Sequence, residues 1–285
     1  MPEQNLPVIA AIPNYNMAES LQRLLPQVLK QGYEHIYVLD DASTDNSREV
    51  VAAFGPAITF VAGQENLCSG GNRNRILEVL PTNAIIHFLD ADTELEGSNV
   101  AQTIQGLFQG SSLKIVGGLV KTPGGTQQIW NYGPSPSLYG LLTAVLHSRL
   151  ELPKHRKSAA TWRRLLPYLF NEWPDPLQTP KRRCTYWVHE ANMMMTAATL
   201  SHIGGFESAL RSHDTNGLSM KAYRAGIVTL FDPSVSVIQH NDKNVRPGRR
   251  SKARRKASWY LFRKYGPRAW FLPGGRFKPR YNTEN

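Results

Sequence analysis

The sequence AIIHFLDADTE, residues 84–94, is an apolar run that ends in two aspartates one residue apart. Ala84 to Leu89 has the short apolar composition of a buried strand. Asp90 and Asp92 follow with only Ala91 between them, so both carboxylates can bind one divalent cation whose other ligands are phosphate oxygens and water. Alone, an Asp-x-Asp is weak evidence, because such pairs also form solvated turns and helix caps. The surrounding pattern therefore has to decide.

The chain before this run alternates short apolar segments with helical periods, which is typical of a parallel α/β sheet. Strands are predicted over 8–12, 36–39 and 58–61, and helices over 21–29, 45–54 and 72–80. Polar clusters follow, namely PNYN (13–16), DDASTDNS (40–47) and NLCSGGNRNR (66–75). Ligands of open α/β sheets bind outside the carboxyl ends of the strands. We therefore expect these clusters and DADTE (90–94) to converge on one crevice.

The second half of the chain is less regular. Residues 115–120 predict another strand, whereas 123–180 are rich in proline, glycine and aromatic residues, with helical patches at 139–150 and 159–170. We interpret 123–180 as an insertion that partly covers the site. Order returns over 186–240, with a predicted helix at 214–225 and strands at 227–231 and 235–239.

Composition limits the class of protein. The chain has 285 residues and a net charge of +11, but residues 1–110 hold 5 Lys/Arg against 13 Asp/Glu, and residues 111–285 hold 28 against 9. An acidic first half suits a divalent metal and a basic second half suits an anionic partner. Two distant cysteines indicate neither a disulfide framework nor a structural zinc site. The start of the chain does not resemble a signal peptide, and no apolar run approaches the length of a membrane span. These features favour the cytoplasm, with peripheral contact at the cytoplasmic membrane face.

Two of the polar clusters suit a nucleotide. Asp40 and Asp41 stand at a strand end, where a carboxylate can accept from the imide N–H of a pyrimidine; Ser43 to Asp45 would then cap the next helix. Capping alone is the simpler interpretation of the same residues. Paired glycines at a helix start, with Arg73 and Arg75, can bring backbone amides and a guanidinium to a diphosphate.

In this order and spacing, PNYN, LDDASTDNS, NLCSGGNRN and LDADT resemble the family 2 glycosyltransferases of the GT-A fold. Two later segments also resemble the family, EANMMMTAATLSHIGGFESALRSHDTNGLSMKAYRAG (190–226) and VSVIQH (235–240). The resemblance implies an α/β fold of GT-A type, with a Rossmann-like, mostly parallel central sheet flanked by helices. It divides this one domain into a nucleotide-sugar-binding half (1–122), an acceptor-side half (123–240) that contains the insertion, and a basic C-terminal helical extension (241–285).

The resemblance also implies roles for the donor-side residues. Pro13, Tyr15 and Asp41 would hold the nucleoside, and Arg73 would lie near the base or the diphosphate. Asp90 would face the ribose and Asp92 would bind Mn²⁺ or Mg²⁺.

On the acceptor side, Asp214 occupies the position of the family's catalytic base. The family usually has Glu-Asp here, whereas this chain has His213-Asp214. His213 is the alternative base. His240 matches a position where some GT-A enzymes have an additional metal ligand; a lone histidine at a strand end is otherwise an ordinary packed or surface residue.

Together these residues predict an inverting, metal-assisted transfer of a sugar from a nucleotide diphosphate to an acceptor hydroxyl. The expected donor is a UDP-sugar, with dTDP- and GDP-sugars as alternatives, and the acceptor is a glycan that can be lipid-linked. The chain lacks the Gln-x-x-Arg-Trp element of processive members, which favours transfer of one sugar or a few. The rival hypotheses are a nucleotidyltransferase with a similar sheet, and a basic module that binds nucleic acid or membrane.

The basic extension ends the pattern. Seven cations between Arg246 and Lys256 precede an aromatic cluster at 259–262 and then Arg263 and Lys264. Such a stretch is typical of an interfacial helix, and 246–264 is our candidate for membrane contact. A packed, solvated helix and a nucleic-acid-binding segment, the least favoured, are the alternatives.

Overall fold

The computed structural model describes residues 6–79, 81–110, 114–135, 137–149, 156–211, 213–240 and 247–265. Its strands are β1 Val8–Asn14, β2 His35–Asp40, β3 Ile58–Ala62, β4 Ile85–Leu89, β5 Thr93–Glu96, β6 Lys114–Lys121, β7 Tyr132–Gly133, β8 Arg183–Cys184, β9 Trp187–Val188, β10 Asn192–Thr196 and β11 Val228–Gln239. Its helices are α1 Ala18–Val28, α2 Ser47–Ala52, α3 Cys68–Asn74, α4 Ile76–Val79, α5 Val100–Leu107, α6 Leu138–Ser148, α7 Arg156–Leu165, α8 Ala197–His202, α9 Asp214–Arg224 and α10 Pro247–Tyr265, with 3-10 turns η1 Gly55–Ala57 and η4 Pro167–Leu169.

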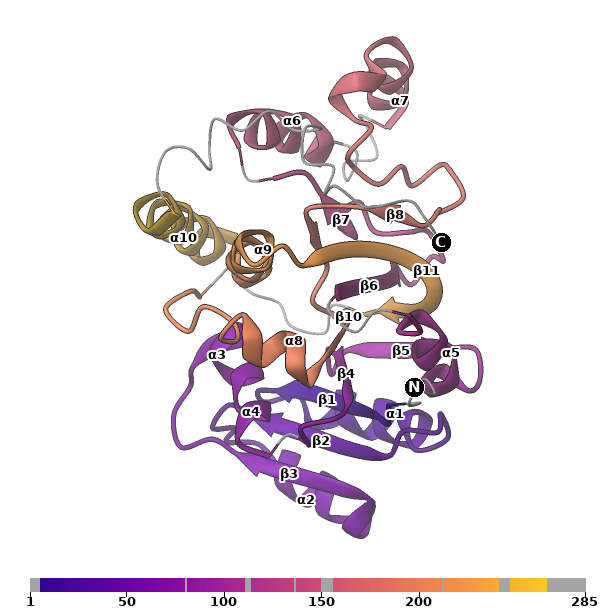
Figure 1. Ribbon diagram of the computed structural model, residues 1–285, viewed down its shortest axis with the longest axis vertical. Helices are drawn as coiled ribbons and strands as arrows, with labels where there is room; N and C mark the ends of the chain where they lie inside the picture. Colours follow the sequence, from indigo (N-terminus) through magenta and orange to yellow (C-terminus); the bar gives the residue numbers. More distant parts are fainter. Residues whose placement is uncertain are drawn as a thin grey trace.

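One nine-stranded sheet forms the centre of the molecule (Figure 1). Its order is β3-β2-β1-β4-β10-β6-β11-β5, and β8 pairs with β11 beside this path. The pairs β3-β2, β2-β1 and β1-β4 are parallel, as is β6-β11. β10 runs antiparallel to both β4 and β6 and joins the two parallel groups. The carboxyl ends of β1, β2 and β4 therefore lie along one edge of the sheet.

Both faces of the sheet are buried, which explains the nearly continuous apolar strands. Val8, Ala10 and Ile12 of β1 belong to one core cluster with the apolar stripe of α1. Ile9 and Ala11 of the same strand face the other cluster, which includes residues of β4, β10 and α9. Alternation along β1 thus places successive side chains in two separate cores.

A buried polar network crosses the middle of the sheet. His87 lies between the Tyr33 hydroxyl, 2.7 Å from Nδ1, and the Asn192 side-chain oxygen, 2.8 Å from Nε2. The Asn192 amide also donates to the carbonyls of Leu119 and Val235, at 3.1 Å each. A Cβ on Gly118 would lie 2.2 Å from this amide, so the glycine is what allows it to approach β6. Burial lowers the pKa of His87 to about 4.

The predicted strands of the first half are confirmed, but several boundaries differ. The helix predicted over 72–80 begins earlier and divides into α3 and α4. The strands predicted at 227–231 and 235–239 form the single strand β11, whose pairing with β6 is irregular between Phe231 and Ser236. Several elements were not predicted, namely β5, α5, β10, α8 and the two-residue strands β7, β8 and β9. The methionines of β10 are weak strand formers, and only its neighbours in the sheet make it a strand.

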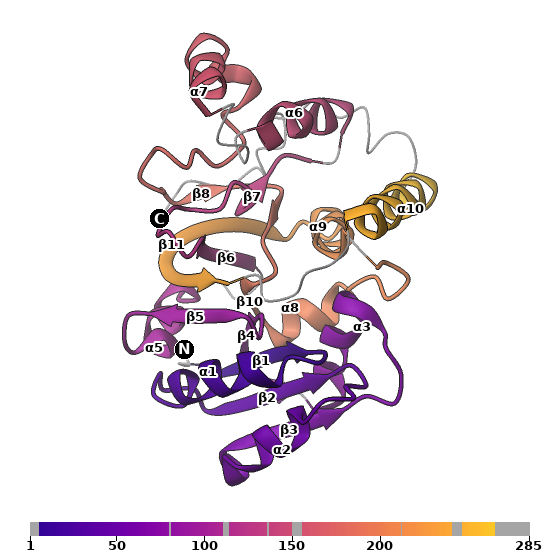
Figure 2. The same cartoon turned by 180° about the vertical axis from the view of Figure 1, so that it is seen from behind.

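The insertion and the C-terminal helix both contain packed side chains. His147 of α6 stacks on Trp173 and lies within 2.6 Å of the Ile129 carbonyl. Figure 2 shows α6 and α7 at the end of the molecule opposite β3, and α10 beside α9. Ala257, Leu261 and Tyr265 of α10 are buried in a cluster with residues of the α8–α9 region. The extension therefore contains a packed helix; Arg246 and residues 266–285 lie outside the described residues.

Within the described ranges, no helix is long and apolar enough to cross a membrane. Cys68 and Cys184 are both free thiols.

Candidate active site

The first polar cluster anchors the loop after β2. The buried Asn14, at the end of β1, donates from its side-chain amide to Asp40 (2.8 Å) and to the Ser43 hydroxyl (3.1 Å). Asp40 also accepts from the backbone N–H of Ser43 at 2.9 Å. Asp40 is thus occupied in shaping the loop, and the neighbouring Asp41 has other partners.

Asp41 is held by the segment that contains the paired glycines. Its carboxylate accepts from the backbone N–H of Leu67 at 2.8 Å and lies 3.4 Å from the Arg75 guanidinium. Asn72 of α3 fixes this arrangement, because it accepts from Arg75 (3.1 Å) and donates to the Leu39 carbonyl (2.7 Å). Arg75, rather than Arg73, is therefore the cation beside the candidate nucleoside carboxylate. Pro13 is half-buried and Tyr15 exposed at the end of β1, next to this loop.

The two aspartates after β4 approach one side chain. The Gln239 amide nitrogen, at the end of β11, lies 3.4 Å from Asp90 Oδ2 and 3.2 Å from Asp92 Oδ1. Gln128 orients this amide by donating to its oxygen at 3.0 Å. Gln239 was not among the predicted site residues, although it directly precedes the candidate ligand His240. Asp90 and Asp92 thus converge as expected, and Gln239 occupies the space between them.

The space beside Asp90 and Asp92 is the candidate metal site. The described residues contain no group of three histidine, cysteine or carboxylate side chains that could hold a metal ion. Two converging carboxylates still fit a Mg²⁺ or Mn²⁺ that takes its remaining oxygens from phosphate and water. The His240 backbone N–H donates to the Asp92 carbonyl (2.9 Å), whereas its ring lies 3.2 Å from Glu94. The structure thus brings His240 next to Asp92 through the backbone and directs its ring to Glu94.

Arg73 connects the donor-side and acceptor-side carboxylates. Its side chain is 1% exposed and lies 2.5 Å from Asp90 Oδ1 and 3.7 Å from Asp214 Oδ2. It also donates to the Ser69 hydroxyl. Asp214 is the first residue of α9, where the helix dipole favours a negative charge. A Cβ on Gly70 would lie 3.0 Å from the Asp214 Cβ, so the glycine permits this close approach of α3 and α9.

His213 precedes α9 with a left-handed backbone, φ 60°. Histidine tolerates this conformation better than most residues. Its ring nitrogen Nδ1 lies 3.2 Å from the Asn216 amide. Asp214, not His213, is therefore the residue that the structure joins to Arg73 and Asp90.

Glu190 is a further carboxylate of this site. It is half-buried, and burial raises its pKa. The neighbouring His189 and Arg73 act in the opposite direction, whereas Asp214 and Asp90 raise the pKa further. In the sequence, Glu190 is the first residue of the segment 190–226 that resembles the family, but no role was predicted for it. Glu190 thus adds a carboxyl of raised pKa near the candidate base.

A family model described as glycosyl transferase family 2 matches residues 9–167, more than half of the chain. The chain belongs to glycosyl transferase family 2. The match includes all the donor-side motifs, whereas Asp214 and His240 lie beyond it. No curated protein sequence matches the chain.

Solved structures of similar fold agree with this family. A mannosyltransferase from Pyrobaculum calidifontis in complex with GDP-Man and Mn²⁺ is 19% identical, with a TM-score of 0.58 over 93% of this chain and 65% of the other. GalNAc-T7 with UDP, GalNAc and Mn²⁺ is 13% identical, with a TM-score of 0.59 over 84% of this chain and 44% of the other. TarS of S. aureus in complex with UDP-GlcNAc is 16% identical, with a TM-score of 0.53 over 90% and 67%. This chain thus spans less than two thirds of the length of the first two structures. The likeness to the three structures establishes the GT-A fold.

Proposed function

We propose that this family 2 protein is an inverting glycosyltransferase that moves one sugar from a nucleotide diphosphate to an acceptor hydroxyl. One observation carries the proposal: Arg73 contacts Asp90 of the donor side and Asp214 of the acceptor side within one buried cluster. A donor carbon and an acceptor hydroxyl must meet between such groups for direct displacement. The contact therefore supports chemistry at the boundary between the two halves.

The donor is a nucleotide sugar, bound at the carboxyl ends of β1, β2 and β4. Asp41 accepts from the base, between Pro13 and Tyr15, and Asp90 faces the ribose. A UDP-sugar is our first candidate and dTDP- or GDP-sugars are the alternatives. The ligands named for the three similar structures, GDP-Man, UDP with GalNAc, and UDP-GlcNAc, support this class of donor.

Asp92 is the main protein ligand for Mn²⁺ or Mg²⁺, and His240 is the additional one. When bound, the cation stabilises the charge on the departing diphosphate. Gln239 supports this assignment, because its amide holds the carboxylates of Asp90 and Asp92 close together before the donor arrives.

Asp214 is the general base. It removes the proton from the acceptor hydroxyl as that oxygen attacks the anomeric carbon, and the bond from this carbon to the diphosphate oxygen breaks on the opposite face. One displacement inverts the anomeric configuration. The buried position of Asp214, 4% exposed, keeps competing water away from the reacting hydroxyl.

The acceptor is a glycan on the side of the insertion 123–180. The outer face of α10 is the candidate for contact with membrane lipid, and hence with a lipid-linked acceptor. Arg255, Lys256 and Trp259 are exposed there, with Trp259 at 61%. Exposed cations beside an exposed tryptophan suit an anionic interface.

The decisive measurement is calorimetric titration of the Asp92→Ala variant with UDP-sugar and Mn²⁺. We expect metal-dependent donor binding to be lost, because the cation loses its main protein ligand. Glu49→Ala, at an exposed position of α2, is the matched control and should bind as the unaltered protein does. Unchanged donor affinity in Asp92→Ala would remove Asp92 from the metal site.

A further inference from the structure

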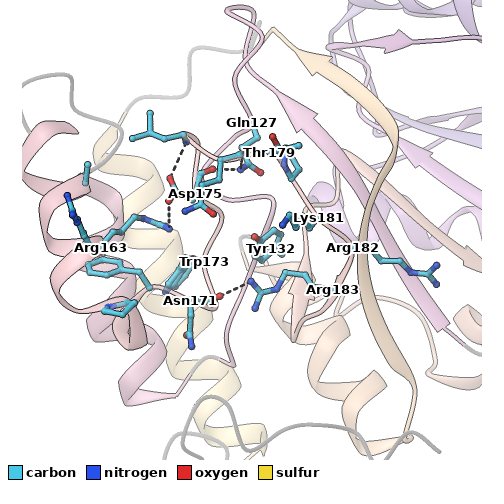
Figure 3. Close-up of a pocket in the computed structure, with 17 residues that line it drawn as sticks. Gln127, Tyr132, Arg163, Asn171, Trp173, Asp175, Thr179, Lys181, Arg182 and Arg183 are labelled. Carbon is cyan, nitrogen blue, oxygen red and sulfur yellow. Dashed lines mark hydrogen bonds and ion pairs between the residues drawn. The ribbon is translucent and has the colours of Figure 1, made fainter. Parts of the chain in front are cut away.

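A second cavity, of about 640 Å³, lies in the insertion between α7, η4 and the segment that leads into β8 (Figure 3). Arg163 borders it from α7, and Lys181, Arg183 and Tyr132 border it from the opposite side. None of the residues assigned to the donor or the catalytic base lines this cavity. It is therefore separate from the site described above.

The lining carries an excess of positive charge. Five of its residues are arginine or lysine, and Asp175 is the one carboxylate among them. Asp175 is already 3.4 Å from Arg163, and Arg182 pairs at 3.4 Å with Asp232 outside the cavity. Arg164 and Lys181 are exposed and have no carboxylate partner within the described part of the chain. Such an excess of cations favours an anionic ligand.

Three buried polar atoms of this lining have no hydrogen-bond partner within the described residues. They are the Nε of Arg163, the Nε of Arg183 and the Oε1 of Gln127, whose side chain is 7% exposed. Leaving such atoms unpaired is costly, so a ligand that pairs them gains affinity. An anionic oxygen accepts from the guanidinium groups, and a hydroxyl donates to Gln127. The ligand must therefore offer both.

The remaining walls suit a sugar ring. Tyr132, Phe170 and Trp173 line the cavity, and Arg183 lies 5.0 Å from the centre of the Tyr132 ring. Aromatic side chains provide flat apolar surface for the C–H face of a saccharide, while the arginines contact its charged group. Hydroxyls, an apolar face and a negative charge occur together in a sugar phosphate or a uronic acid.

Adjacent residues connect the cavity with the candidate metal site. Gln127 lines it, and the next residue, Gln128, donates to Gln239, which in turn contacts Asp90 and Asp92. We propose that this cavity binds an anionic saccharide, the phosphate- or carboxylate-bearing part of the glycan acceptor. Its role as an acceptor subsite rests on the proposed function, whereas its preference for an anionic saccharide does not.

The test measures binding to the full chain saturated with UDP and Mn²⁺, which keeps the probes out of the donor site. The probes are glucose 6-phosphate, glucuronic acid, inorganic phosphate and neutral glucose. We expect at least one anionic sugar to bind about tenfold more tightly than glucose and to weaken with salt. Tighter binding of glucose 6-phosphate identifies phosphate as the preferred charged group, and tighter binding of glucuronic acid identifies carboxylate. Weaker binding of inorganic phosphate than of glucose 6-phosphate shows that the sugar ring contributes.

The variant Arg164→Gln with Lys181→Gln removes the two unpaired cations without disturbing a buried contact. We expect this variant to bind the anionic sugar about fivefold or more weakly, and its melting temperature to stay unchanged. The matched control, Lys30→Gln with Arg23→Gln, removes two exposed charges elsewhere and should bind within about twofold of the unaltered protein.

Equal binding of glucose and both anionic sugars would overturn the proposal, as would an unchanged affinity in the Arg164/Lys181 variant. Binding of neither anionic sugar at about 10 mM would also overturn it, because such an affinity is below any useful subsite. Failure of the unaltered protein to bind any nucleotide sugar with Mn²⁺ would instead count against the proposed function.

Discussion

Arg73 contacts carboxylates from both halves of the chain. It contacts Asp90, directly after β4, and Asp214, at the start of α9, while almost fully buried. A buried guanidinium between two carboxylates fixes their separation, because moving either would leave a buried charge unpaired. The distance between donor-side and acceptor-side carboxylates is therefore a property of the folded protein and does not depend on substrate to set it.

We predict that Asp214→Asn lowers turnover about a hundredfold or more, as expected when a general base is lost. Donor affinity should change little, because no donor-side side chain other than Arg73 contacts Asp214 in the described residues. Steady-state kinetics together with calorimetric donor titration separates the two effects. Turnover at the unaltered rate would transfer the role of base to His213.

Glu190 gives a pH-dependent prediction for stability. Its pKa is raised by burial, so the folded protein holds this proton more tightly than the unfolded chain does. The stabilisation is complete below the unfolded pKa of about 4.3 and is lost as pH rises through the higher folded pKa. Glutamine stays neutral. We therefore expect the melting temperature of Glu190→Gln, minus that of the unaltered protein, to increase from about pH 4 to pH 8.

The exposed Glu49→Gln is the control, and its difference should stay flat over the same pH range. A Glu190→Gln difference that decreases with pH would mean that Arg73 stabilises an ionised Glu190 more than burial disfavours it.

At the scale of elements, α10 has two unlike faces. Ala257, Leu261 and Tyr265 are buried against the catalytic domain, and Glu207 accepts from Tyr260 (3.1 Å) and Lys264 (2.7 Å). Glu207 also accepts from the Tyr265 hydroxyl. The helix is thus packed on one side, and Arg255, Lys256 and Trp259 are exposed on the other.

We predict that Leu261→Ala lowers the stability by about 2–5 kcal/mol, because it opens a cavity in this packing. Trp259→Ala, at an exposed position of the same helix, should leave the melting temperature unchanged but weaken binding to anionic vesicles. Thermal melts and cosedimentation with anionic and neutral vesicles, beside duplex DNA, check both expectations. Equal vesicle binding by Trp259→Ala and the unaltered protein would contradict a membrane role for this face.

Whether a strand could be predicted depended on whether its own residues or its neighbours in the sheet make it a strand. β1, β2 and β4 were predicted because their apolar runs are buried on both faces and end at polar clusters. β10 was missed because Met193 to Met195 do not favour a strand on their own; two neighbouring strands make them one. In the site, Asp90 and Asp92 both approach the Gln239 amide, and their binding of one cation stays a prediction. Gln239 could not be predicted, because it reaches them from β11 through a pairing about 150 residues away in sequence.

At the scale of the whole molecule, one continuous sheet carries both the strands that end at the polar clusters and β10, which precedes α8 and α9. The charge asymmetry of the sequence does not divide the sheet into two ends, because β5 from the acidic half is the neighbour of β11 from the basic half. The acidic half supplies β1 to β5, and the basic half supplies β6 to β11, the insertion and α10. Opposite net charges on the two halves favour the approach of an anionic ligand from the side of the basic half.

The late position of β10 in the chain affects how the protein can be synthesised. β4 pairs with β1 on one side and with β10 on the other, yet residues 192–196 leave the ribosome about a hundred residues after β4. Until then the apolar edge of β4 has no strand beside it, and unpaired edges of this kind promote aggregation. Before residues 192–196 emerge, the nascent chain should therefore need chaperone protection, even though β1 and β4 are already outside.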